Sequence, residues 1–300
     1  MLELHKSKKI FKTNLISTIA ATQNLNEAFN AVYNNRKKYH HNNDIWHLSS
    51  NWLSHRKQIQ NDMLNGTYHL EPVSIKHIKG NWCAKDTVVL RAILNVLNRS
   101  LKQTDLFNNV YHLIGNGGVK KATTDAKTAI DSKSYRHLIK SDVASFYAST
   151  NHSVLLKECK KYIKDKKILQ IIKQYANRLE DYNGEYIHIT QGISKGCPLS
   201  PLMGAIMLKS LDNKMPENVK YIRFMDDWLI LTKTKSVLRK CVKIMHRVMK
   251  GLKYKLALDK TFIGKISRGF RFLGQRFDDT GLLGPINKTM KTNGINVINN

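Results

Sequence analysis

The sequence predicts an α+β fold, in which a sheet is backed by helices. The first part of the chain has helical periodicity over most of its length. From about residue 135, elements follow in the order strand, helix, strand, helix, hairpin, helix, strands. The 300 residues, of which 42% are hydrophobic, are enough for one large domain or two to three subdomains.

The N-terminal part is expected to be mainly helical. Apolar residues recur at helical spacing over 14–39, 44–65 and 86–101, and Asn65-Gly66 is a stop signal for the second of these helices. The segment TYHLEPVSIKHI alternates apolar and polar residues, as a half-buried strand does. The sequence GNGG at 115–118 is typical of a turn and lacks the spacing of a phosphate-binding loop.

The elements expected after residue 135 are short. HLIKSDVASFYAS predicts a strand that runs into a turn, YIHIT a further strand and YIRFMDDWLILT a hairpin. Helices are expected over 152–178, in PLSPLMGAIMLKSLDNKM, and over 235–252, where the helix is amphipathic and basic. LKYKLAL and the segment around RGFRFLGQRF predict the last strands.

The charge of the chain indicates a polyanionic partner. There are 50 Lys and Arg against 22 Asp and Glu, a formal net charge of +28. Such an excess costs self-repulsion and is typical of proteins that bind nucleic acid. A membrane surface is the alternative, but no stretch of 18 apolar residues is present and the basic residues are spread along the chain. We therefore expect nucleic acid and no membrane as partner.

The four cysteines favour a reducing compartment. Cys83, Cys159, Cys197 and Cys241 are far apart and form no CxxC pair. This usage is typical of the cytoplasm, where thiols stay reduced.

Two adjacent carboxylates, Asp226 and Asp227, interrupt the apolar runs of YIRFMDDWLILT. Strands tolerate aspartate poorly, and paired carboxylates repel each other unless a cation such as Mg²⁺ neutralises them. Aspartate is also a common turn residue, so a plain hairpin turn explains the pair equally well.

A third carboxylate, Asp142, ends the apolar strand in HLIKSDVASFYAS, 226 − 142 = 84 residues before the pair. If the two strand ends lie side by side, three carboxylates converge. Such a cluster suits phosphoryl transfer with two metal ions. The alternative is that Asp142 caps the strand end and begins a turn. Between these positions QGISKGCPLSP has the glycines and prolines of a tight bend.

These segments together resemble the reverse transcriptases, in particular the bacterial enzymes related to group II intron, retron and defence-associated proteins. SDVASFYAS is similar to the family's first palm motif, QGISKGCPLSP to the next, and FMDD to its paired-aspartate signature. GLKYKLALDKT resembles the lysine-bearing segment and FRFLGQRF the primer-grip hairpin, while GTYHLEPVSI and DTVVLRAILNVL resemble the fingers. The similarity covers about residues 25–280.

The resemblance implies a right-hand polymerase with fingers and a ferredoxin-like palm. It divides the chain into an N-terminal helical region with fingers over 1–134, a palm with interleaved fingers elements over 135–280 and a short tail over 281–300. Only about 25 residues follow the primer-grip segment. We therefore expect the thumb to be reduced or absent.

The resemblance also implies site residues. Asp142, Asp226 and Asp227 would be catalytic and, with the carbonyl of Val143, would bind two Mg²⁺ ions. The expected nucleotide-binding residues are Phe146, Tyr147, Gln191, Gly192, Lys260 and Lys79.

The family parallel gives several of these residues a specific task. Tyr147 would lie under the sugar and exclude a 2′-hydroxyl, although a core aromatic is the alternative. Leu273 and Gly274 would form the primer grip. The sequence departs from the family at Phe224, where the signature usually has tyrosine, and in the fingers, where no clear arginine contacts the triphosphate.

The implied function is synthesis of DNA on an RNA template from deoxynucleotides and a primer. The expected template is a structured non-coding RNA in an antiphage defence system. An RNA polymerase that copies RNA is one alternative, against which Tyr147 argues. A non-enzymatic, maturase-like splicing cofactor is another, against which the three aspartates argue.

Overall fold

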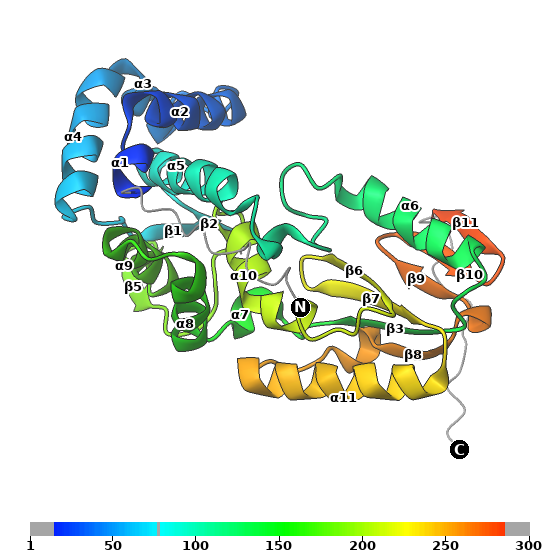
Figure 1. Ribbon diagram of the computed structural model, residues 1–300. Helices are drawn as coiled ribbons and strands as arrows, with labels where there is room; N and C mark the ends of the chain where they lie inside the picture. The colour runs from blue at the N-terminus through cyan, green and yellow to red at the C-terminus, as the bar shows by residue number, and fades with distance from the viewer. Residues whose placement is uncertain (1–14, 77–78, 286–300) are drawn as a thin grey trace.

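The computed structural model describes residues 15–76 and 79–285 (Figure 1). Both helices and strands are present, which confirms the expected α+β class. The α-helices of the described residues are α1 (Leu15–Ile19), α2 (Thr22–Arg36), α3 (Asp44–Ser50), α4 (Trp52–Asn65), α5 (Ala84–Leu101), α6 (Gly118–Asp131), α7 (Phe146–Ser149), α8 (His152–Tyr162), α9 (Lys166–Ala176), α10 (Ser200–Asp212) and α11 (Lys235–Leu252).

The strands form three sheets, with the orders β2-β1-β4-β5, β6-β7-β3-β8 and β11-β10-β9. Short 3-10 helices lie at Asp105–Phe107 (η1), Leu258–Lys260 (η2) and Ile266–Arg268 (η3). The strands are β1 (Val73–Lys76), β2 (Lys79–Asn81), β3 (His137–Asp142), β4 (Leu179–Tyr182), β5 (Glu185–His188), β6 (Lys220–Phe224), β7 (Asp227–Thr232), β8 (Phe262–Lys265), β9 (Phe270–Phe272), β10 (Gln275–Asp278) and β11 (Gly281–Pro285).

The sheet β6-β7-β3-β8 has the ferredoxin-like arrangement that the family resemblance implied. Every neighbouring pair is antiparallel, so β3 and β6 are parallel and β7 lies between them. α10 precedes β6 in the chain and α11 connects β7 to β8. This is the split βαβ topology with a second helix before the last strand.

Both faces of this palm sheet are buried, which is why its strands read as continuous apolar runs. On one face Ile139, Trp228 and Ile230 belong to the large core that includes the apolar sides of α10 and α11. On the other face Leu138 and Leu229 pack with α6 and the sheet β11-β10-β9. The ribbon shows α11 beneath the palm sheet and α6 above it (Figure 1).

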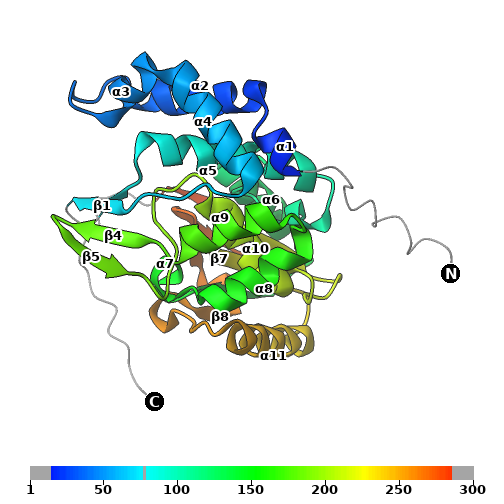
Figure 2. The same ribbon diagram turned by 90° about the vertical axis from the view of Figure 1, so that its left-hand side faces the viewer.

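The sheet β2-β1-β4-β5 joins segments that are distant in sequence. β1 pairs with β2 from the N-terminal part and, in parallel, with β4, which follows α9. The hairpin β4–β5 therefore lies in a different sheet from β3 and β6, between which it falls in the chain. α5 packs against α2, α1 and α3, and these helices form a layer beyond the palm (Figure 2).

Several expected elements are confirmed by the structure. α4 ends at Asn65, and Gly66 follows in a left-handed conformation (φ +76°) that closes the helix. α11 spans 235–252 as expected, and α5 begins two residues before the expected start at 86. The hairpin of β6 and β7 is also present.

Other expected elements are wrong in ways that have physical causes. The helix over 152–178 is divided after Tyr162, because the Asp165 carboxylate accepts the N–H groups of Lys167 and Ile168 and starts α9 (2.9 and 3.4 Å). The helix over 14–39 is likewise divided, into α1 and α2. Of TYHLEPVSIKHI, only Val73–Lys76 is a strand within the described residues.

Two further differences come from weak or misleading apolar patterns. α6 was not expected, because its buried face consists mainly of small residues, Ala122, Ala126 and Ala129. LKYKLAL is not a strand. Its alternation arises because Leu252 and Tyr254 are buried while Lys253 and Lys255 are exposed, and Leu256 forms only an isolated bridge, to Val143.

No helix in the described part of the chain is both long and apolar enough to cross a membrane.

Candidate active site

The three predicted aspartates meet at one end of the palm sheet. Asp142 is the last residue of β3 and lies opposite Asp227, the first residue of β7. Asp226 stands in the two-residue turn between β6 and β7. The expectation that the two strand ends lie side by side is therefore confirmed. Val143 follows with its side chain buried.

The turn that carries Asp226 is fixed by hydrogen bonds to both the N–H and the carbonyl of Met225. Met225 is in a left-handed conformation (φ +55°), which is unusual for a residue with a side chain. Its N–H donates to Nδ1 of His112 (2.8 Å), and its carbonyl accepts from Nη1 of Arg223 (2.9 Å). Desolvation and the charge of Arg223 lower the pKa of His112 to about 3, so the ring is neutral. Nε2 then donates to the carbonyl of Pro201 (3.1 Å).

Arg223 is itself fixed by a fully buried ion pair. Its Nε and Nη2 donate to the two oxygens of Asp212 (2.7 and 2.6 Å), and Tyr221 donates its hydroxyl to the same carboxylate (2.7 Å). Arg223 and Asp212 expose 0% and 1% of their side chains. The planar guanidinium can bind the carboxylate and reach Met225 at once. This buried network supports the turn that carries Asp226 from within the core.

Two lysines neutralise the aspartates in this structure. Lys260 donates from Nζ to Oδ2 of Asp142 (2.6 Å), and Nζ of Lys140 lies 3.6 Å from Oδ1 of Asp227. Burial, followed by contact with Asp142, raises the pKa of Asp226 to about 7. Burial also raises the pKa of Asp227 to about 6, although Lys140 opposes this shift. The end of the sheet thus holds three crowded, partly buried carboxylates, two of which are paired with lysines.

The donor set fits a hard divalent cation. Oδ1 of Asp142 and Oδ1 of Asp227 are both buried and, among the described residues, have no hydrogen-bond partner, although the Lys140 ammonium lies 3.6 Å from the Asp227 oxygen. Such oxygens are costly unless a cation or water occupies the space beside them. Carboxylate oxygens are the ligands that Mg²⁺ prefers.

The carboxylates are nevertheless not arranged as a finished metal cage. Within residues 15–76 and 79–285, no group of three or more His, Cys, Asp or Glu side chains is in position to hold a metal ion. The ammonium groups of Lys140 and Lys260 are beside the carboxylates instead. Oδ2 of Asp142 is available to a metal ion only if Lys260 gives up its contact, whereas Oδ1 has no hydrogen-bond partner among the described residues.

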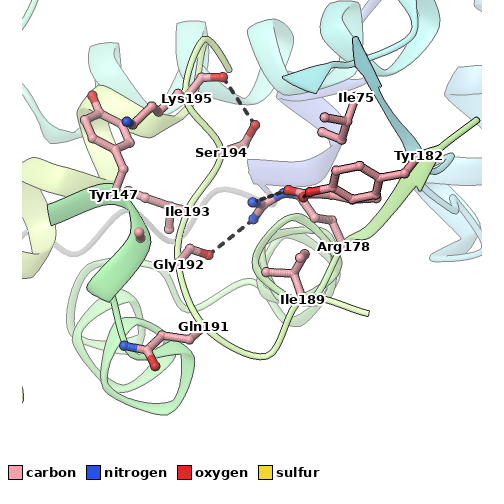
Figure 3. A pocket seen from close by; sticks show the side chains of 12 residues that line it. Ile75, Tyr147, Arg178, Tyr182, Ile189, Gln191, Gly192, Ile193, Ser194 and Lys195 are labelled. Atoms are coloured by element: carbon pink, nitrogen blue, oxygen red, sulfur yellow. Dashed lines mark hydrogen bonds and ion pairs between the residues drawn. The ribbon is translucent and has the colours of Figure 1, made fainter. Parts of the chain in front are cut away.

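A cavity of about 540 Å³ lies between α7, β4 and the loop 189–195 (Figure 3), and none of the three aspartates is among its lining residues. Tyr147, Gln191 and Gly192 line it together, as expected of nucleotide-binding residues. Burial and then the charge of Asp226 raise the pKa of Tyr147. The side chain of Tyr147 is half-buried and also packs against the core, so the alternative of a core aromatic stays open.

The opposite wall of the cavity was not expected from the sequence. Arg178 donates from Nε and Nη2 to Oε1 of Glu180 (2.9 and 2.6 Å), and Tyr182 donates to Oε2 of the same carboxylate (2.8 Å). Figure 3 shows Tyr182 and Arg178 beside Ile75, across the cavity from Tyr147. No motif identifies these residues, because they line the cavity only after β4 pairs with β1.

Gly192 allows the cavity loop to approach α7 closely. Its φ is +95°, and a Cβ atom there would lie 2.9 Å from the Tyr147 carbonyl oxygen and 3.0 Å from that of Ala148. The N–H of Gly192 donates to the Thr150 carbonyl (2.8 Å), and the N–H of Ile193 to the Tyr147 carbonyl (2.7 Å). Gly192 is thus needed both for its backbone conformation and for its small size.

Gly192→Ala is expected to destabilise the fold by about 1–3 kcal/mol, since it adds backbone strain and a clash with backbone oxygens. Because the clash moves Tyr147, kcat/KM for nucleotide addition should also fall roughly 10²-fold. Urea unfolding and primer extension measure the two effects. Gly196→Ala is the matched control, because Gly196 also has a positive φ (+82°) but has open space around it. Equal effects of both substitutions would contradict the role of close packing.

Of the remaining predicted residues, one is buried, two form a hairpin turn and one has a side chain that is not described. Phe146, expected at the nucleotide, is 2% exposed and packs against Tyr254 (ring centroids 5.4 Å apart), so this expectation is corrected. Its ring supports Tyr147 from below, edge-on at 5.6 Å. Leu273 and Gly274 form the two-residue turn of the β9–β10 hairpin, both with positive φ. The side chain of Lys79 lies outside the described part of the chain.

Sequence reasoning missed His112 and Lys140, as well as the Arg223–Asp212 pair. Lys140 had a local signal, because a lysine two positions before Asp142 points to the same face of an otherwise apolar strand. Arg223 is likewise a charge inside the apolar run of β6. His112 had none, since its contacts to Met225 and Pro201 depend on the tertiary fold.

Comparison with known proteins agrees with this geometry. Residues 83–277 match the family described as reverse transcriptase (RNA-dependent DNA polymerase). The chain is 23% identical over 266 residues to Protein YkfC of Escherichia coli (strain K12), which covers 73% of this chain and 70% of that protein.

Solved structures with a similar fold include two telomerases. One is telomerase from Candida albicans in complex with the TWJ fragment of telomeric RNA (TM-score 0.51, 14% identity, 63% of this chain and 36% of that chain). The other is telomerase from Candida tropicalis in complex with the same kind of fragment (TM-score 0.51, 16% identity, 68% of this chain and 38% of that chain). The chain spans less than half of either telomerase, and the likeness concerns the fold.

Proposed function

This chain belongs to the reverse transcriptase family, and on that premise we propose that it extends a primer with deoxynucleotides on an RNA template. The observation that carries the proposal is the pairing of β3 with β7, which brings Asp142 opposite Asp227. Converging carboxylates are what phosphoryl transfer from a nucleoside triphosphate needs, and the cavity lined by Tyr147, five residues after Asp142, offers space for a nucleotide.

In this proposal each residue has a definite task. Asp142, Asp226, Asp227 and the backbone carbonyl of Val143 would hold two Mg²⁺ ions, which supply charge neutralisation and align the primer hydroxyl with the triphosphate. Lys260 has more than half of its side chain exposed, and its contact with Asp142 raises its pKa, so it stays charged. It can turn from the carboxylate to the anionic triphosphate.

Gln191 and Gly192 would border the nascent base pair. Gln191 donates from Nε2 to the Ser149 carbonyl (3.0 Å), which fixes it at the mouth of the cavity. Leu273 and Gly274 would support the primer end. The positive φ values of this turn make the β9–β10 hairpin a tightly defined platform for that contact.

Tyr147→Val is expected to weaken the selection of deoxynucleotides over ribonucleotides by roughly 10²-fold, the size of effect that a single hydroxyl has in a shaped pocket. The reason is that the ring would no longer occupy the space of a 2′-hydroxyl. Primer extension with each dNTP and its matching NTP measures the ratio of kcat/KM. Tyr147→Phe is the control, because it keeps the ring and should keep the selection. Wild-type protein that prefers ribonucleotides would favour the RNA polymerase alternative.

We also propose that the template is a dedicated structured RNA and that DNA synthesis serves antiphage defence. The net charge of +28 supports a large RNA partner, and the resemblance to defence-associated enzymes supports the biological role. Sequencing of the RNA and DNA that co-purify with the protein tests the first part. Phage plating with wild type and Asp226→Ala tests the second, since an enzymatic defence must fail in the variant.

A further inference from the structure

One face of α11 carries only positive charge. Between Lys233 and Leu258 the chain has nine Lys or Arg and no Asp or Glu. The apolar side of the helix is buried through Leu238, Cys241 and Met245. Its exposed side presents Lys235, Arg239, Lys240, Lys243, His246, Arg247 and Lys250. Because exposed positions recur every three to four residues, the charges form one continuous stripe.

This stripe faces away from the proposed nucleotide site. The buried side of α11 packs on β3, β7 and α10, so its charged side is turned outward from the palm sheet. In both views the helix lies at the edge of the molecule opposite the layer of α1–α4 (Figures 1 and 2). None of its residues lines the cavity of Tyr147 and Gln191.

The charges of the stripe are not balanced by the protein. Among residues 15–76 and 79–285, no ion pair involves a Lys or Arg of α11. Like charges one turn apart on a helix repel one another and weaken it. A helix in which every exposed charge has the same sign is therefore suited to a partner that supplies the opposite charge.

We propose that the exposed face of α11 is a second RNA-binding surface, separate from the nucleotide cavity. The proposal rests on the proposed function, which supplies RNA as the partner. The stripe spans about 27 Å, at 1.5 Å per residue over 18 residues, and offers a cation about every turn. Regularly spaced cations suit the phosphates of a nucleic-acid backbone, whereas the sequence of the bases is not read.

The position of the stripe fits RNA that is connected to the active site. After α11 the chain returns to the catalytic strand, where Ala257 N–H donates to the Asp142 carbonyl (2.9 Å) and Ala144 N–H to the Lys255 carbonyl (2.9 Å). The C-terminal end of the stripe is therefore next to the aspartates, and its N-terminal end is a helix length away. RNA bound along α11 would be anchored close to the site where a template is copied.

A membrane surface is the less suitable partner. Helices that bind in the plane of a bilayer combine a basic face with large apolar residues that enter the lipid. The large apolar residues of α11, among them Met245, Val248, Met249 and Leu252, are buried against the palm. The exposed arc contains only Lys, Arg, His, Ser and Gly.

Binding of a labelled 60-nucleotide single-stranded RNA tests the proposal directly. The test variant is Arg239→Gln/Lys243→Gln/Arg247→Gln/Lys250→Gln, which keeps good helix formers. We expect at least 10-fold weaker binding at about 150 mM salt. The slope of log affinity against log salt should fall by about 3, since four phosphate contacts each contribute about 0.7.

The control removes the same charge from other exposed lysines, as Lys37→Gln/Lys38→Gln/Lys57→Gln/Lys102→Gln. It should weaken RNA binding less than threefold. Circular dichroism melting of each variant checks that the fold is kept.

Three results would overturn the proposal. The first is that the α11 variant binds RNA as tightly as wild type, and the second is that the α11 variant and the lysine control lose RNA binding equally. The third is that the α11 variant loses binding to vesicles with 30% phosphatidylserine but still binds RNA. Primer extension by the wild-type protein is scored separately. If the wild type extends no primer but the α11 variant selectively loses RNA binding, the proposed polymerase activity fails and the surface stands.

Discussion

Asp226→Asn is expected to reduce primer extension on the order of 10³-fold or more. The carboxylate stands in the turn between β6 and β7, next to Asp142 and Asp227, and Asn cannot supply the negative charge that a divalent cation needs. Several kcal/mol of transition-state stabilisation depend on such charge, and each 1.36 kcal/mol corresponds to a factor of ten. Single-turnover nucleotide addition in Mg²⁺ measures the effect.

The control for this loss is Asp259→Asn. Asp259 is an exposed aspartate one residue before Lys260, so its replacement also removes one negative charge near the site. Nearly full activity of this control, together with an inactive Asp226→Asn protein, would assign the effect to the catalytic turn. An active Asp226→Asn protein would favour the non-enzymatic alternative, in which the chain only binds RNA.

The same substitution should stabilise the metal-free protein at high pH. Burial raises the pKa of Asp226 to about 7 from its ordinary value of 3.8. A raised folded-state pKa means that stability is fully present below the unfolded value and is lost as pH rises through the folded value. Asn removes this loss. The variant should therefore have a higher Tm than wild type at about pH 8, by roughly 2–4 °C for each kcal/mol of destabilisation that is removed. At about pH 4 the two proteins should have nearly the same Tm. Mg²⁺ should raise the Tm of wild type more than that of the variant.

Asp212→Ala is expected to cost about 3–5 kcal/mol of folding stability, because it leaves the buried Arg223 guanidinium without its carboxylate. Arg223 also donates to the carbonyl of Met225, so the turn that carries Asp226 should loosen and nucleotide addition should fall even in the folded fraction. Urea unfolding gives the stability, and kcat at a temperature well below the Tm gives the second effect.

Tyr221→Phe separates the ion pair from the rest of the network. It removes only the hydroxyl that donates to Asp212, and it should cost about 1 kcal/mol and leave activity nearly unchanged. If Asp212→Ala is as mild as Tyr221→Phe, the ion pair does not hold the catalytic turn, and the contact of His112 with Met225 is sufficient.

The conformation of the turn at Met225 depends on two separate hydrogen bonds. A left-handed residue at Met225 is unfavourable by itself, and it persists because His112 and Arg223 occupy its N–H and its carbonyl. The two supports come from different parts of the chain, the loop before α6 and strand β6. The position of Asp226 is therefore a property of the packed palm and not of the hairpin alone.

Under the proposed function, Lys140 and Lys260 would change their ion-pair partners when nucleotide and metal ions bind. Both lysines are beside carboxylates that the proposed function assigns to metal ions, and Lys260 is in direct contact with Asp142. The lysines lower the repulsion among the aspartates before substrate binds. Under the proposed function, a nucleotide with its metal ions would offer a cation to Asp142 and an anion to Lys260, so that each charged group would keep a partner of opposite charge.

The sequence by itself determined the class of the fold and the centre of the site. Apolar periodicity placed α5 and α11 closely, because each of these helices is long enough to show a buried face. It also placed the end of α4, but the single helix expected over 44–65 is divided into α3 and α4. The aspartates could be found because charged residues in apolar strands are rare and need a cause. α6, with its alanine face, escaped detection because small residues leave little hydrophobic signal.

Only the tertiary structure decided which residues surround those aspartates. The pairing of β1 with β4 made Arg178, Glu180 and Tyr182 a wall of the cavity, and the packing of α7 on the loop 189–195 made Gly192 indispensable. The same packing buried Phe146, although its neighbour Tyr147 lines the cavity. Contacts such as these join residues far apart in the chain and depend on strand register and close packing, which local patterns of hydrophobicity do not encode.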